Sequence, residues 1–146
     1  MKYHILQVAL TNKEVDMIND PNGKGHQAVG RHWRRTGLNF SIEAEWNNID
    51  VADYDHVADI EADHLDHVWA IGNSDSRRDK NPAIELLMYG PDKYMSSISI
   101  GDLIVNSETK NVFAVKGMGF MKLDIPVEKV ENVLYKDVDH VVEEVV

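Results

Sequence analysis

Cysteine is absent from the 146-residue chain, which excludes disulfide bonds and thiolate metal sites. No apolar run approaches the roughly 20 residues that a membrane-spanning helix requires, and no apolar leader precedes the first strand-like segment. A chain of this length buries about 68 to 70% of the surface of its unfolded form without covalent cross-links. These absences predict one soluble domain over residues 1–146, located in the cytoplasm, with no membrane partner.

Charge of one sign is also missing from two successive stretches of a chain whose formal net charge is −10. Residues 21–40 contain no Asp or Glu, and residues 38–76 contain no Lys or Arg. The first stretch carries Lys24, Arg31, Arg34 and Arg35; the second carries Glu43, Glu45, Asp50, Asp53, Asp55, Asp59, Glu61, Asp63, Asp66 and Asp75. A basic patch is therefore followed directly by an acidic stretch.

The usual signatures of catalysis and nucleotide binding are missing as well. The glycines of the run NGKGHQAVGRH satisfy neither G-x-x-x-x-G-K-[ST] nor G-x-G-x-x-G. Ser97 and Ser99 have no histidine nearby in the sequence, and a triad assembled from distant residues has no support in the pattern. The sequence therefore assigns no catalytic residue and no cofactor, and it does not favour an enzyme.

The clearest structural pattern present is a β-hairpin module at residues 96–123. Two arms rich in β-branched and apolar residues flank a polar turn at residues 106–111. Gly101 interrupts the first arm where a kink or bulge is expected, and Asp102 is expected to bond the local backbone there.

The remaining segments complete an α+β pattern. Leu65, Val68 and Trp69 predict one face of a helix that Gly72 ends in a left-handed conformation. Strands are expected over residues 3–11 and 38–46, and a short extended piece over 57–60. Further helices are expected over 13–19, over 25–35 and from residue 127 onward. Residues 137–146 are expected to form an extended acidic tail. We expect a small, mainly antiparallel sheet with two or three packed helices.

The hairpin module resembles one found in small uncharacterised phage and plasmid proteins related to YodL-like domains. The pattern of that module is S-x-S-[VI]-G-D-[VI]-[VI], followed after a short hairpin by a G-[FW] pair. The corresponding residues are Ser97, Ser99, Ile100, Gly101, Asp102, Leu103, Ile104, Gly119 and Phe120, and Leu103 replaces the usual Val or Ile. Residues 54–65 are similar to the V-A-[DE]-[VI]-x-[AT]-x-x-L element that precedes the hairpin in such proteins. The resemblance covers roughly half the chain and implies a phage or plasmid gene context, without any catalytic residue.

The acidic stretch is the first candidate for function. Its carboxylates could imitate the phosphates of a duplex, whose charges recur every 1.7 Å or so, or could simply keep the protein soluble. The predicted interaction surface comprises Glu43, Glu45, Asp50, Asp53, Asp55, Asp59, Glu61, Asp63 and Asp66.

Two weaker candidates accompany it. Arg31, Arg34 and Arg35, with Trp33 as a stacking plane, could bind an anion, but we expect these arginines to pair with the adjacent acids instead. His64 and His67 lie i, i+3 among carboxylates, yet their spacing matches no recognised metal motif.

The leading hypothesis is a phage or mobile-element accessory protein that binds and modulates a host protein, in host takeover or anti-defence, through the acidic surface. One alternative is a small-molecule or nucleotide sequestration protein, or small enzyme, that uses the Arg31–Arg35 patch. Another is a virion or assembly component that uses its C-terminal tail. Direct nucleic-acid binding is not expected, and the oligomeric state is left open.

Overall fold

The computed structural model describes residues 1–38, 46–73, 81–88 and 93–136. An antiparallel sheet in the order β3-β2-β1-β4-β5-β6 forms its centre. The strands are β1 (Lys2–Gln7), β2 (Asp55–Glu61), β3 (Ile84–Leu86), β4 (Leu103–Asn106), β5 (Val112–Val115) and β6 (Phe120–Leu123). The helices are α1 (Asn12–Asn19), α2 (Gly30–Gly37), α4 (Leu65–Gly72) and α5 (Val127–Glu131), with the short 3-10 turns η1 (Gly25–Ala28) and η3 (Val51–Asp53). The predicted α+β class with a mainly antiparallel sheet is confirmed.

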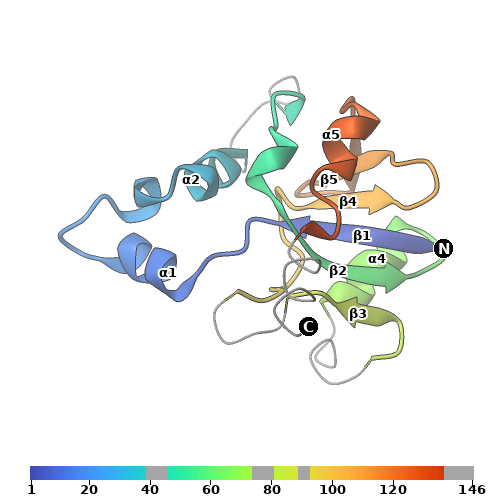
Figure 1. The fold of residues 1–146 in the computed structure, drawn as a ribbon, viewed down its shortest axis with the longest axis horizontal. Coiled ribbons are helices and arrows are strands. Elements are labelled where there is room, and N and C mark those ends of the chain that lie inside the picture. The colour runs from blue at the N-terminus through green and yellow to red at the C-terminus, as the bar shows by residue number, and fades with distance from the viewer. Residues whose placement is uncertain (39–45, 74–80, 89–92, 137–146) are drawn as a thin grey trace.

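The sheet has an apolar core on each face. On one face, Val68 of α4 packs with Ile5 of β1 and Ile60 of β2. On the other face, Val130 of α5 packs with Leu103 of β4. Figure 1 shows α4 and α5 against opposite faces of the sheet, with α1 and α2 projecting to one side of it. Burial of apolar side chains on both faces is the main stabilising contribution of this arrangement.

The predicted hairpin is present as β4 and β5, but it begins later than the sequence pattern indicates. The strand starts at Leu103 because Gly101 breaks the extended backbone with φ +92, a conformation that favours glycine. The Ser99 N–H donates to Asp102 Oδ2 at 2.8 Å, which confirms the expected local bonding of Asp102.

The helix after β2 departs from prediction in two respects. The helical spacing predicts one apolar face for Leu65, Val68 and Trp69, but the exposed fraction of Trp69 is 47%. The sequence also predicts a left-handed conformation at Gly72, which is wrong: within the described residues, glycines with positive φ are only Gly25, Gly101 and Gly119. Gly72 instead lies against Ile98: a Cβ there would be 2.2 Å from Ile98 Cδ1, so a larger residue would require that side chain to shift.

Other helix and strand boundaries in the structure differ from the predicted ones by a few residues. The helix expected at 13–19 begins at Asn12 and is capped by Thr11: the Thr11 hydroxyl accepts from the Glu14 N–H, and the Glu14 side chain accepts from the Thr11 N–H, which is a capping box. The strand expected at residues 3–11 ends at Gln7. Most of the strand expected at 38–46, and all of the tail at 137–146, lie outside the described residues.

Candidate functional site

The basic patch lies on α2 and is bonded to protein acceptors. Arg31 Nη2 donates to Glu14 Oε1 at 2.7 Å and to the Ala9 carbonyl at 2.8 Å, and its Nη1 donates to Asp55 Oδ2 at 3.1 Å. Arg31 thus connects α1, the end of β1 and the start of β2. This contact set gives Arg31 a structural role.

The two other arginines are paired as well. Arg34 donates from Nε and Nη2 to the two carboxylate oxygens of Asp53, at 2.8 and 2.6 Å. Arg35 donates from the corresponding atoms to Asp102 Oδ1, at 3.1 and 3.0 Å. The expectation that Arg31, Arg34 and Arg35 pair with protein carboxylates is therefore confirmed.

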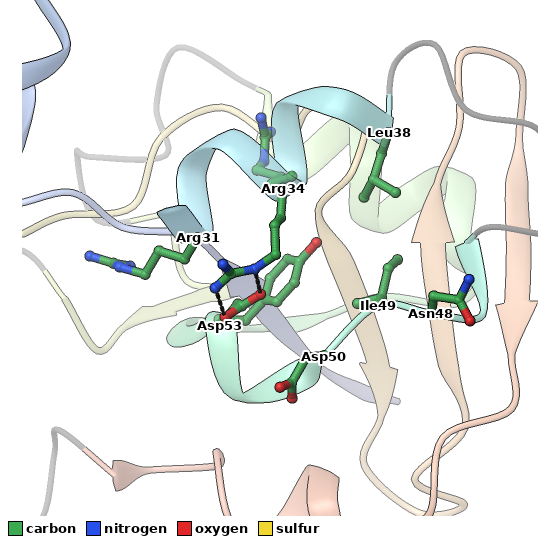
Figure 2. A pocket seen from close by; sticks show the side chains of 9 residues that line it. Arg31, Arg34, Leu38, Asn48, Ile49, Asp50 and Asp53 are labelled. Carbon is green, nitrogen blue, oxygen red and sulfur yellow. Dashed lines mark hydrogen bonds and ion pairs between the residues drawn. The ribbon is translucent and has the colours of Figure 1, made fainter. Parts of the chain in front are cut away.

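A cavity of about 370 Å³ opens beside these arginines. Figure 2 shows the Arg34 guanidinium turned towards Asp53, while Arg31 extends in a different direction. The guanidinium groups therefore do not converge on one point, as a phosphate clamp would require. Trp33, the predicted stacking plane, has an exposed fraction of 46%.

Asp102 is the centre of a buried polar network below α2. Its Oδ2 also accepts from Gln7 Nε2 at 3.0 Å, so its carboxylate is bonded to β1, α2 and the Gly101 kink together. Complete burial raises the pKa of Asp102, and the charge of Arg35 opposes that rise. The nearby Tyr54 hydroxyl donates to the Gly101 carbonyl at 2.6 Å.

A second buried network lies between β1 and β2. His4 Nδ1 and His56 Nε2 each donate to Asp59 Oδ1 at 2.6 Å, and the Tyr135 hydroxyl donates to Asp59 Oδ2 at 2.6 Å. Burial alone raises the pKa of Asp59, but the hydrogen bonds from His4, His56 and Tyr135 outweigh burial and hold the pKa below its usual value. Asp59 is therefore a buried carboxylate that remains charged at neutral pH.

This network is the one group of three metal-ligating side chains that converge in the described ranges: His4, His56 and Asp59 have ligand atoms within 4.8 Å of one another. However, the Tyr135 N–H donates to His56 Nδ1 at 2.9 Å. Nδ1 must therefore carry the lone pair and Nε2 the proton, which points at Asp59. A metal-bound histidine normally donates from its second nitrogen, so the geometry fits a hydrogen-bonded network better than a metal site.

The histidines that the sequence proposed for metal binding serve the helix instead. His64 Nδ1 accepts the His67 N–H at 3.2 Å and caps α4, and His67 Nδ1 accepts the Asp63 N–H at 3.3 Å. Neither His64 nor His67 belongs to the converging group found among the described residues.

The predicted acidic surface is divided by the fold. Asp53 and Asp55 are bound by arginines, Asp59 is buried, and Asp50 accepts the Ala52 N–H at 3.0 Å. Glu43 and Glu45 lie outside the described residues. The members of the predicted surface that are exposed and bound by no arginine are Asp50, Glu61, Asp63 and Asp66.

Three of these acids lie in or just before α4: Glu61 ends β2, Asp63 precedes the helix cap His64, and Asp66 is in the first turn of the helix. The core-facing side of this helix carries Val68, whereas Asp66 and Trp69 lie i, i+3 on the exposed side. We call Glu61, Asp63, Asp66 and Trp69 the α4 face. Glu61 Oε2 lies 2.9 Å from the Met1 amino group, and no lysine or arginine of the described residues is paired with Asp63 or Asp66.

Sequence reasoning did not single out His4, Gln7 or Tyr135, although each contributes to a buried network. A signal was present in two of the strands. His4 lies between apolar residues in β1, and Asp59 does so in β2. A polar residue in a buried strand must find a partner, and these two are cross-strand partners in the register.

Comparison with known proteins gives no relative: no family model, no curated protein and no solved structure matches the chain. Within the described residues, the helices are all too short or too polar to cross a membrane.

Proposed function

We propose that this chain is a non-enzymatic accessory protein that binds a partner protein through the α4 face. The observation that carries the proposal is Trp69, a large aromatic side chain with 47% of its surface exposed on a helix whose other side is fixed in the core. Exposed tryptophans on rigid elements are typical anchors of protein interfaces. A partner that covers Trp69 would remove this apolar surface from water.

The charges around Trp69 indicate the chemistry of the partner. Asp66 is exposed one helical turn before Trp69, Asp63 is exposed just before the helix, and Glu61 precedes them at the end of β2. A complementary surface would present an apolar pocket for the indole with lysine or arginine at its rim, because opposite potentials speed association and select the partner. The resemblance of the hairpin module to phage and plasmid proteins points to a host protein, in takeover or anti-defence.

The distribution of acids favours such a local contact over imitation of a duplex. A mimic requires many regularly spaced free carboxylates, whereas Asp53, Asp55 and Asp59 are engaged inside the protein. The alternative of anion sequestration by the Arg31–Arg35 patch is not favoured, since each guanidinium already binds a carboxylate. The virion alternative depends on residues 137–146, outside the described part of the chain.

The test compares two tryptophans that are exposed to almost the same extent, Trp69 at 47% and Trp33 at 46%. Tagged wild-type protein, Trp69→Ala and Trp33→Ala are incubated with bacterial host lysate at low and high salt, and bound proteins are identified by mass spectrometry. We expect a partner that Trp69→Ala binds at least about tenfold more weakly, equivalent to about 1.4 kcal/mol, and that Trp33→Ala retains.

The acids are tested in the same assay. Asp63→Asn combined with Asp66→Asn should weaken binding and reduce its dependence on salt, because exposed charges are screened over about 8 Å at physiological ionic strength. Capture of no specific partner, or equal capture by wild type and Trp69→Ala, would refute the proposed function.

A further inference from the structure

Two histidines hold the N-terminal end of α4 through ring nitrogens that must be unprotonated. His64 is the N-cap residue, and its Nδ1 accepts the N–H of His67 at 3.2 Å. His67 in turn accepts the N–H of Asp63 with its own Nδ1 at 3.3 Å. A backbone N–H can only donate, so both Nδ1 atoms carry a lone pair and the ring proton lies on Nε2. These two contacts therefore require two neutral imidazoles at the start of the helix.

A histidine cap differs from the usual helix caps in its response to acid. Ser, Thr and Asn keep their acceptor oxygen over the whole physiological pH range, whereas imidazole gains its second proton between about pH 5 and 8. Once Nδ1 of His64 is protonated, it has no lone pair and cannot accept the His67 N–H. The cap of α1 is the hydroxyl of Thr11, which has no such dependence on pH.

Protonation would also change the charge at this end of α4. The charged groups placed there among the described residues are Asp63 and Asp66 on either side of the cap, Glu61 at the end of β2, and the Met1 amino group, 2.9 Å from Glu61. The two imidazole ring centroids lie 6.0 Å apart, so two imidazolium groups would repel each other and the positive N-terminal end of the helix. They would also offset two of the three negative charges of the α4 face.

We propose that His64 and His67 make the α4 face sensitive to acid: their protonation removes the cap from the first turn of α4 and cancels most of the negative charge of the face. Trp69 follows in the second turn of the same helix. A partner with a basic rim would therefore be held at neutral pH and released in a mildly acidic medium. This inference rests on the proposed function, because it assigns regulation to the same face, but the switch itself is measured without a partner.

The switch is measured on the full chain by NMR from about pH 8 to about pH 5. Proton–nitrogen correlation spectra report which ring nitrogens carry protons, and we expect a bare Nδ1 in both His64 and His67 at the upper pH. The amides of Asp63 and His67, corrected for the intrinsic exchange rate at each pH, should lose protection at least about fivefold at the lower pH, as expected for loss of a cap. The Glu14 amide, which donates to the Thr11 hydroxyl, is the internal reference and should keep its protection.

A variant with caps that do not titrate separates the two histidines from other effects of acid. His64→Asn with His67→Asn keeps an oxygen that can accept a backbone N–H, so the amides of residues 63 and 67 should have the same protection at both pH values. His26→Asn is the matched control, because His26 is an exposed histidine of η1 outside the α4 face, and it should behave as wild type. Circular dichroism establishes that each variant is folded; if the double variant is not, His64→Asn alone, measured at the amide of residue 67, replaces it.

The partner assay then tests the consequence for binding. Wild type and His26→Asn should bind the captured partner at least about tenfold more weakly at mildly acidic than at neutral pH, and the double variant should change by no more than about twofold. Unchanged protection of the Asp63 and His67 amides on acidification, or equal loss of protection in wild type and the double variant, would overturn the switch. These readouts need no partner, so their failure is distinct from failure of the proposed function, which is judged by partner capture and by Trp69→Ala.

Discussion

Replacing Tyr135 with phenylalanine removes one hydroxyl from the buried Asp59 network. That hydroxyl donates to Asp59 Oδ2 at 2.6 Å, and burial together with Asp59 raises its pKa, so it stays protonated and continues to donate. Hydrogen bonds to charged groups contribute about 1.5 to 3 kcal/mol. We therefore expect Tyr135→Phe to lower the free energy of unfolding by about 2 kcal/mol at pH 7.

The assay is urea denaturation followed by circular dichroism. With a slope of about 2 kcal/mol per molar urea, within the range of small proteins, the midpoint should fall by about 1 M. Tyr54→Phe is the matched control, because the Tyr54 hydroxyl donates at the same distance, 2.6 Å, to a neutral acceptor, the Gly101 carbonyl.

The two variants should differ in their dependence on pH. The network holds the pKa of Asp59 below the unfolded value of about 3.9. Its carboxylate therefore stabilises the folded state above about pH 4, and this contribution is lost as the pH falls through that value towards the lower folded pKa. The cost of Tyr135→Phe should shrink in the same window, while the cost of Tyr54→Phe should not.

A destabilisation below about 0.5 kcal/mol at pH 7 would show that the Tyr135 hydroxyl is equally well bonded to water. A loss that stays constant from pH 7 to the acid limit of folding would show that the Asp59 charge is not involved. Either result would refute the reasoning.

Further variants test the other buried network and the kink. Arg35→Ala leaves the buried Asp102 carboxylate without its cation and should lower the free energy of unfolding by about 3 to 5 kcal/mol. The Arg34 side chain is 61% exposed, so Arg34→Ala should lower it by about 1 kcal/mol or less. Equal losses of stability in urea denaturation would contradict this. Gly101→Ala should cost more than Gly119→Ala, because both positions have positive φ but only Gly101 would also place a Cβ within 3.2 Å of Arg35 Cγ. Melting temperatures compare the two glycine variants, and a Gly101→Ala protein as stable as Gly119→Ala would refute the steric part of the argument.

Local sequence patterns correctly predicted the features that depend on near neighbours. The α+β class, the hairpin, the kink at Gly101 and the extended piece that became β2 all follow from short-range periodicity and from glycine conformation. The pairing of the basic patch with acids was also predictable, because opposite charge blocks are adjacent in the sequence. The partners themselves were predictable only in part: Asp53 and Asp55 belong to the acidic stretch, but Asp102 lies in the hairpin module.

The exposure of Trp69 could not be predicted from helical spacing alone. Positions 65, 68 and 69 share a broad helix face, yet Val68 is fully buried while Trp69 is 47% exposed. Which residues of an amphipathic face become buried depends on the angle at which the helix packs, and that angle is set by distant residues.

The sequence by itself determined the element types, the absence of cysteine chemistry and the two charge blocks. The tertiary structure decided which charges remain available: it brings His4, His56 and Tyr135 to Asp59, pairs the arginines of α2 with carboxylates, and leaves Trp69 and Asp66 on the exposed side of α4. The physical reason is that a side chain's charge is fixed by its chemistry, whereas its partners are fixed by contacts between residues far apart in the chain. Only folding determines which charges are satisfied internally and which remain for a ligand.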